Sequence, residues 1–101
     1  MTIPASRFRI DGEFTIYRAA ELAAAMRTAL AQVDEGAAFD VDLSGVTEMD
    51  SAGVQLLVAA RRSAGESGRT LRIAGRSPAV VEVFRIQQLA PHFGDATIEA
   101  H

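Results

Sequence analysis

The sequence predicts an α/β fold in which helices pack against one small mixed β-sheet. Three observations lead to this prediction. Several short segments alternate apolar and polar residues, as strands do, and longer segments repeat apolar residues at spacings of three and four, as amphipathic helices do. Glycine or proline separates one segment from the next. Because strand–helix–strand units place parallel strands side by side, the expected order of hairpin, helix, strand, helix, strand and helix builds a single sheet.

The N-terminal part of the chain has the pattern of a β-hairpin. Residues Phe8–Ile10 and Phe14–Ile16 alternate in polarity, and the pair Asp11-Gly12 between them is a strong signal for a tight turn. We therefore expect two short paired strands whose apolar side chains share one face. These side chains are Phe8, Ile10, Phe14 and Ile16.

The pattern then changes to a helix followed by a strand. Arg18–Val33 is rich in alanine, which favours helix, and Gly36 follows it as a stop signal. One face of this helix is expected to carry Leu22, Met26, Leu30 and Val33. Phe39–Leu43 alternates with aspartates and predicts a strand that Ser44-Gly45 ends, with Val46–Asp50 as a short connection.

Two further helices and a strand are expected in the second half. Ser51–Ala64 predicts a helix, and Thr70–Ala74 predicts a strand that Gly75 breaks. Ser77 and Pro78 suit the N-cap and the first position of a last helix. The expected core residues of the two helices are Val54, Leu57 and Val58, then Val80, Val81, Phe84 and Ile86. Thr97–Glu99 predicts a short edge strand.

Length and charge restrict the class of protein. The 101 residues suit a single domain over 1–101, with a core at about residues 7–90 and little volume for a substrate cavity. The net charge is −3, and the ten basic residues are scattered arginines, which does not favour nucleic-acid binding. The N-terminus does not resemble a signal peptide, and no apolar stretch reaches the roughly 18 residues of a membrane span. We expect a cytoplasmic protein that does not insert into membranes, as a monomer or an oligomer.

The residues give little support for catalysis. Cysteine is absent, and no Asp or Glu at the spacing of metal ligands accompanies His92 and His101. Nothing in the sequence positions His92 near Ser51, as a catalytic triad would require. Asp40 and Asp42 project to one face of their strand; they could be a general acid/base pair, but two solvated charges are the simpler interpretation. No glycine-rich phosphate-binding motif is present, so a nucleotide or small-molecule sensor is the least supported class. We expect no enzymatic activity, no metal and no cofactor.

Ser51 lies where a strand-to-helix connection meets the first turn of a helix. Either Asp50 or Ser51 can cap the free N–H groups of that turn. Ser51 can also accept a phosphate, which the positive end of the helix dipole would favour. A partner docked there would meet added negative charge beside Asp42, Glu48 and Asp50, which we expect to lie close together. The two interpretations are compatible, because one residue can begin a helix and also be modified.

Two segments carry a family resemblance. "DLSGVTEMDSAGVQLL" and "GRTLRIAGRSPAVVEVF", together with the opening "DGEFTI", resemble the STAS family, which includes bacterial anti-sigma factor antagonists. The resemblance covers about Phe8–Phe84. It implies a bacterial protein-interaction switch in transcription regulation, in which a partner serine kinase phosphorylates Ser51 after Asp50, a phosphatase reverses the mark, and Gly53 matches the family glycine. The sequence departs from the family at Ala52, where a second hydroxyl is frequent, and at Thr15, where an acidic residue is frequent.

The resemblance leaves the partner open. The first interpretation is an anti-sigma factor with kinase activity; the alternative is a constitutive STAS subunit or adaptor, bound to the ATPase of a lipid-transporting ABC complex or to a chemotaxis protein. Val54, if partly exposed, would give the partner an apolar anchor, and Gly53 would let its backbone approach. The expected partner-binding residues are Thr15, Asp42, Asp50, Ser51, Ala52, Gly53, Val54 and Gln55.

Overall fold

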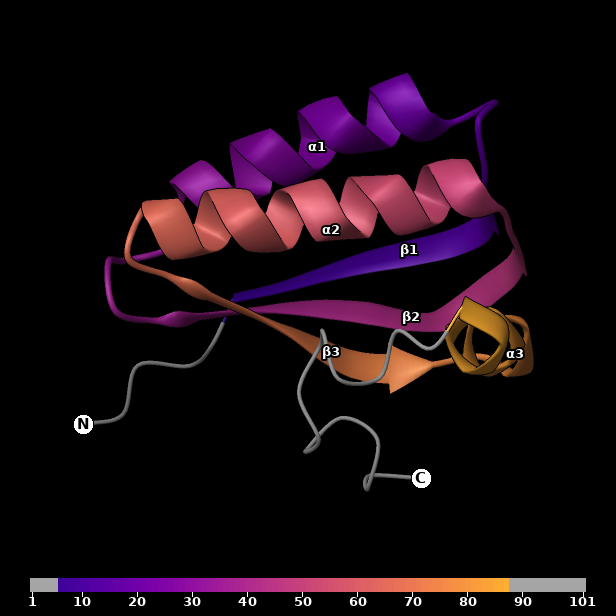
Figure 1. Ribbon diagram of the computed structural model, residues 1–101. Coiled ribbons are helices and arrows are strands. Elements are labelled where there is room, and N and C mark those ends of the chain that lie inside the picture. Colours follow the sequence, from indigo (N-terminus) through magenta and orange to yellow (C-terminus); the bar gives the residue numbers. More distant parts are fainter. Residues whose placement is uncertain (1–5, 88–101) are drawn as a thin grey trace.

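Strand β2 (Ala38–Met49) forms the centre of a parallel sheet, with β1 (Ser6–Phe14) on one side and β3 (Thr70–Arg76) on the other. The computed structural model describes residues 6–87 of the chain. The helices are α1 (Ala19–Ala31), α2 (Ser51–Glu66) and α3 (Pro78–Gln87). Figure 1 shows α1 and α2 side by side over one face of the sheet, and α3 beside the ends of β2 and β3. The predicted α/β fold, with helices packed against a small sheet, is confirmed.

The predicted N-terminal hairpin is wrong. Residues 6–14 form one strand that pairs in parallel with β2, so the antiparallel part of the expected mixed sheet is not found among residues 6–87. Gly12 has a φ of 77°, and the register with β2 shifts on both sides of it. A tight turn and a bulge both use a glycine in the left-handed region, so the pair Asp11-Gly12 fits either one. The sequence interpretation chose the turn, whereas the structure has an irregularity within one strand.

Strand β2 is longer than predicted, because it continues through Ser44-Gly45 to Met49. Gly45 lies opposite Asp11 of β1, and a Cβ atom at this glycine would overlap the Asp11 carboxylate. Glycine here leaves room for side chains of the neighbouring strand, so it does not end the strand in which it lies. The expected connection Val46–Asp50 is therefore mostly strand, and β3 likewise continues through Gly75 to Arg76.

The core lies between the sheet and the helices. Leu22 and Met26 of α1 and Val54 and Leu57 of α2 are buried, as predicted. The largest fully buried side chains are Phe14, Phe39, Ile10, Leu43, Leu57, Val41 and Val80. Helix α1 is somewhat shorter than expected and α2 is longer by two residues.

Helix α3 begins as predicted. The Ser77 hydroxyl accepts the backbone N–H of Val80 at 3.2 Å, and Val80 and Phe84 are buried. The predicted burial of Val81 and Ile86 is wrong, because these side chains are 47% and 63% exposed. The short helix buries one narrow stripe at a spacing of four residues, and neither residue lies on it.

The other sequence predictions concern residues 88–101. His92, His101 and the edge strand Thr97–Glu99 lie outside the described residues. Within residues 6–87, no helix has the length and apolar character that crossing a membrane requires.

Candidate functional site

The candidate site lies where β1 and β2 end and α2 begins, at the carboxyl edge of the sheet. Asp50 is the N-cap of α2: its Oδ1 accepts the backbone N–H groups of Ala52 at 3.0 Å and Gly53 at 3.2 Å. The structure therefore assigns the cap to Asp50, and Ser51 is the first residue of the helix proper.

Asp50 also holds the loop that follows β1. Its second oxygen, Oδ2, accepts the backbone N–H of Ile16 at 3.0 Å. The hydrogen bond from Ile16 lowers the pKa of Asp50, and those from Gly53 and Ala52 lower it further. The carboxylate thus remains ionised at neutral pH and fixes the β1–α1 loop against the start of α2.

Ser51 is exposed, and no hydrogen bond engages its hydroxyl among residues 6–87. Gln55, one turn further along α2, is also exposed, and Ala52 is half-buried. Because the Asp50 carboxylate already accepts the N–H groups of Ala52 and Gly53, the Ser51 hydroxyl is not needed to cap the helix. It is accessible to another molecule.

Gly53 and Val54 occupy the inward side of α2. Val54 is 3% exposed and belongs to the core, as the helix pattern predicts, so the condition on which it would serve as an exposed anchor for a partner is not met. Gly53 is buried as well, and a Cβ atom there would overlap the backbone oxygen of Phe14. The neighbour that approaches this glycine is the protein's own strand β1, which does not support the expected approach of a partner backbone.

Thr15 and Asp42 lie at different distances from Ser51. Thr15, 8% exposed, directly precedes Ile16 in the loop at the site, and its hydroxyl donates to Glu13 Oε1 at 3.2 Å. Asp42 precedes Asp50 by roughly 25 Å of extended strand. The expected proximity of Asp42 to Asp50 is therefore wrong, because β2 continues where a short loop was predicted.

Two residues that the sequence interpretation missed lie in the same loop. Ile16 is 63% exposed and Tyr17 is 88% exposed, directly beside the Asp50 contact. The hairpin prediction had placed Ile16 on one shared face with Phe8, Ile10 and Phe14. The adjacent apolar pair Ile16-Tyr17, which breaks the strand alternation, was the signal that could have identified them.

Two glutamates, Glu13 and Glu48, lie at the same edge of the sheet as Asp50. Glu13 on β1 and Glu48 on β2 are register partners near the ends of their strands, and both are exposed. No ion pair engages either one within the described part of the chain. This edge of the sheet is therefore acidic, and the two glutamates repel each other because they lie opposite on neighbouring strands.

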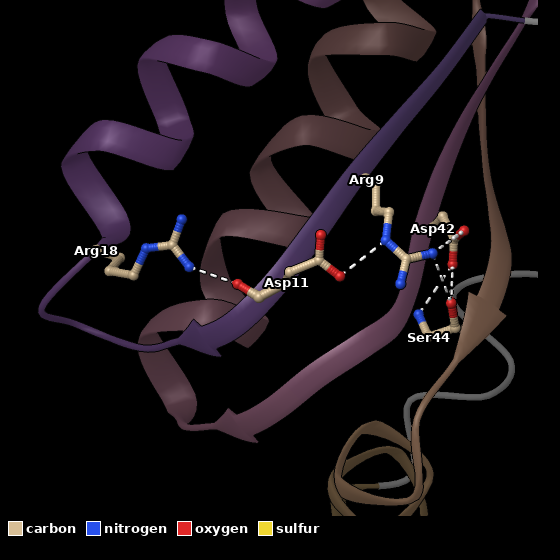
Figure 2. Close-up of polar contacts among 5 residues, drawn as sticks. All are labelled: Arg9, Asp11, Arg18, Asp42 and Ser44. Atoms are coloured by element: carbon tan, nitrogen blue, oxygen red, sulfur yellow. Dashed lines mark hydrogen bonds and ion pairs between the residues drawn. The ribbon is translucent and has the colours of Figure 1, made fainter.

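The aspartates Asp40 and Asp42 belong to two polar groups of their own, away from Ser51, and Figure 2 shows the group around Asp42. The Asp42 carboxylate accepts the Ser44 hydroxyl at 2.7 Å, the Ser44 backbone N–H at 2.9 Å and Arg9 Nη1 at 3.2 Å. These contacts, led by those from Ser44, lower the pKa of Asp42.

Asp40 accepts two hydrogen bonds from Arg72, at 2.8 and 3.1 Å. Each carboxylate thus has its own cationic partner and is only 8% exposed, so the expectation of solvated charges is wrong. Two separately paired carboxylates, one with a lowered pKa, do not form a general acid/base pair. Residues 6–87 contain no cluster of three or more side chains suited to hold a metal ion.

The comparison with protein families decides the relationship. The family model described as "Mlab, STAS domain" matches residues 3–91. The chain belongs to the STAS domain family. Among curated proteins, no sequence matches this STAS domain significantly.

Solved structures show the same fold. The sulfate transporter family protein from Wolinella succinogenes has a TM-score of 0.71 and 18% identity, over 94% of this chain and 77% of its own. The STAS domain of the SulP transporter from Vibrio cholerae has a TM-score of 0.71 and 20% identity, over 95% and 74%. The anti-sigma factor antagonist SpoIIAA in its unphosphorylated form has a TM-score of 0.65 and 24% identity, over 90% and 80%. The expected relationship to STAS domains is therefore confirmed.

Proposed function

We propose that this STAS domain is a non-enzymatic protein-interaction switch, controlled by reversible phosphorylation of Ser51 by a partner serine kinase that acts as an anti-sigma factor. The observation that carries the proposal is the state of the Ser51 hydroxyl, which is exposed and free of hydrogen bonds within residues 6–87, directly after an aspartate that already caps the helix. A kinase can reach this hydroxyl without opening the fold.

A phosphate on Ser51 would act mainly on the partner. It adds a charge of about −1.5 to −2. The N–H groups of Ala52 and Gly53 already donate to Asp50, so they are not free to neutralise it. Asp50 and Glu48 lie close along the chain, and a partner shaped to this acidic edge would meet further negative charge. A loss of about 3 kcal/mol in binding free energy weakens affinity more than a hundredfold.

The partner-binding surface that we propose consists of Ile16, Tyr17, Ser51 and Gln55, and we call it the Ser51 surface. The two apolar side chains are 63% and 88% exposed, and the Asp50 carboxylate holds their loop in place. Tyrosine is frequent among the residues that dominate interface energetics, and a pre-ordered loop reduces the entropy cost of binding. Ile16 and Tyr17 therefore take the role of apolar anchor that the sequence interpretation had given to Val54.

The alternative is a constitutive subunit or adaptor, in which the same surface stays bound to a transporter ATPase or a chemotaxis protein. The exposure of two large apolar side chains favours the adaptor function, because a patch of this kind is usually covered by a permanent partner. In this function Ser51 would be a contact residue without phosphate.

Substitutions at Ser51 separate the two functions. The switch predicts that Ser51→Asp abolishes co-purification of the partner from native cells, whereas Ser51→Ala retains it. The adaptor predicts a stoichiometric complex with wild-type protein and no phosphate on Ser51. If Ser51→Asp binds the partner as well as Ser51→Ala does, the switch is excluded.

A further inference from the structure

A basic hollow lies at the end of α2 opposite to Ser51. It has a volume of about 440 Å³. The charged residues that line it are Arg61, Arg62, Arg69 and Glu66, and the uncharged ones are Gly65, Thr70 and Leu71. In Figure 1 it corresponds to the region where α2 ends and the chain turns into β3. Arg61 lies about 15 Å along the helix from Ser51, so the two regions are separate.

The arginines of the hollow have no acidic partner among residues 6–87. Four other arginines of the domain form ion pairs with carboxylates: Arg9, Arg18, Arg72 and Arg85. Arg61, Arg62 and Arg69 form none, although Glu66 lines the same hollow. Three unneutralised guanidinium groups thus gather in one place on a chain whose net charge is −3.

The helix dipole accounts for neither Arg61 nor Arg62, whereas Arg69 donates to the backbone oxygen of the C-cap residue Ser67, at the negative end of α2. Favourable charge–dipole interaction falls off within the last turn of a helix, and the last turn of α2 contains no basic residue.

Arg69 is held in place by neutral acceptors. Its Nε donates to the backbone oxygen of Val33 at 2.6 Å, and its Nη1 donates to that of Ser67 at 2.9 Å. These bonds fix the guanidinium group between the loops before β2 and β3 and leave its charge uncompensated. A planar guanidinium group fixed in this way can present its remaining donors to an anion without further loss of side-chain freedom.

Gly65 lies within α2 on the wall of the hollow. A Cβ atom there would meet nothing within 4 Å, so packing inside the domain does not require glycine. Glycine within a helix is less favourable than alanine. Glycine at this position keeps the space between the arginines open.

We propose that this hollow binds a ligand that carries a phosphate group with two or more negative charges. The volume lies within the usual range of small-molecule sites, and guanidinium groups recognise phosphate oxygens through paired hydrogen bonds. The phosphate belongs either to a free organic phosphate or to a phospholipid headgroup. Binding here leaves the Ser51 surface uncovered, so the domain can receive a ligand and a protein partner at once.

Two binding measurements on the full chain test the proposal. Isothermal titration calorimetry with pyrophosphate tests for binding of a free phosphate compound. Co-sedimentation with phosphatidylcholine vesicles that contain phosphatidic acid tests for binding of a lipid headgroup. Pure phosphatidylcholine vesicles are the control. Saturable binding of pyrophosphate identifies a free phosphate compound, and binding to the acidic vesicles alone identifies a lipid. Binding of neither probe overturns the proposal.

Matched variants connect the binding to the hollow. Arg61→Gln and Arg62→Gln should each weaken it about tenfold or more, because each removes charged hydrogen bonds. Arg27→Gln removes an exposed arginine of α1 that has no ion pair in the described structure, and it should leave binding of the phosphate probe unchanged. An equal effect of all three variants would reveal general charge attraction and overturn the proposed site.

Gly65→Leu tests the space itself, because it changes no charge. Leucine favours helix over glycine, so the variant should fold at least as well as the wild type while its side chain fills the hollow. We expect binding to be lost with no decrease in thermal stability. Unchanged binding in this variant would show that the ligand does not occupy the hollow.

Discussion

The Asp50 carboxylate accepts the backbone N–H of Ile16 at 3.0 Å, although the two residues lie 34 positions apart in the sequence. The other oxygen of the same carboxylate caps α2. One side chain thus places the apolar loop Ile16-Tyr17 beside the Ser51 hydroxyl. The Ser51 surface depends on this link between two elements.

Removal of this link should loosen the loop. In Asp50→Ala, both the helix cap and the acceptor for Ile16 are lost, so we expect a lower thermal midpoint and faster hydrogen exchange of the Ile16, Ala52 and Gly53 amides. Asp50→Asn retains an oxygen acceptor and a favoured N-cap residue, and should lose less. Unchanged exchange at Ile16 in the alanine variant would contradict the proposed link.

Stability should fall in acid. The pKa values of Asp42 and Asp50 lie below the ordinary value of 3.8 in the folded protein and return to it on unfolding. Their contribution to the free energy of unfolding is therefore complete above about pH 4–5 and is lost as the pH falls through the lowered pKa values. Asp42→Asn should be less stable than wild type at neutral pH, and the difference, measured by urea unfolding, should shrink in acid. A difference that grows in acid would contradict this assignment.

The two glycines of α2 should respond oppositely to alanine. Gly53→Ala places a methyl group against the Phe14 backbone oxygen and should destabilise the fold by about 1–3 kcal/mol. Gly65→Ala meets open space and should stabilise it by up to about 1 kcal/mol. Urea unfolding of both variants measures these changes. Equal destabilisation by the two substitutions would mean that helix position, and not the contact with Phe14, controls the cost.

Substitutions at Val54 and Tyr17 should have different effects, the first on folding and the second on partner binding. Val54→Asp puts a charge into the core, and circular dichroism should show loss of the cooperative folded state. Tyr17→Ser changes an exposed side chain, and we expect a folded protein that binds its partner at least about fivefold more weakly, as for a residue worth more than about 1 kcal/mol at an interface. A folded Val54→Asp protein, or full partner binding by Tyr17→Ser, would contradict the placement of the anchor.

Much of the fold could be predicted because periodicity reports burial directly. The stripe of Leu22 and Met26, and that of Val54 and Leu57, fall on the helix faces that the core covers. The start of α3 at Ser77-Pro78 could also be predicted, since it depends only on local chemistry.

The errors came from glycines whose role depends on distant residues. Asp11-Gly12 and Ser44-Gly45 both look like chain reversals, yet the two segments pair with each other, and Gly45 makes room for the Asp11 carboxylate. The break in alternation at Ile16-Tyr17 indicates that the strand ends there. The exposure of the two side chains itself follows from the parallel pairing of β1 and from a hydrogen bond to Asp50, which the local pattern does not contain. Clustering of Arg61, Arg62 and Arg69 around one hollow is likewise a product of the fold.

The most direct test of the central proposal is the phosphorylation state of Ser51 in protein isolated with its partner from native cells, measured by mass spectrometry. The switch predicts a co-purified serine kinase, phosphate on Ser51 in the unbound fraction and unmodified Ser51 in the complex. A stoichiometric complex with a transporter ATPase or a chemotaxis protein, and no phosphate on Ser51 in either fraction, would contradict it.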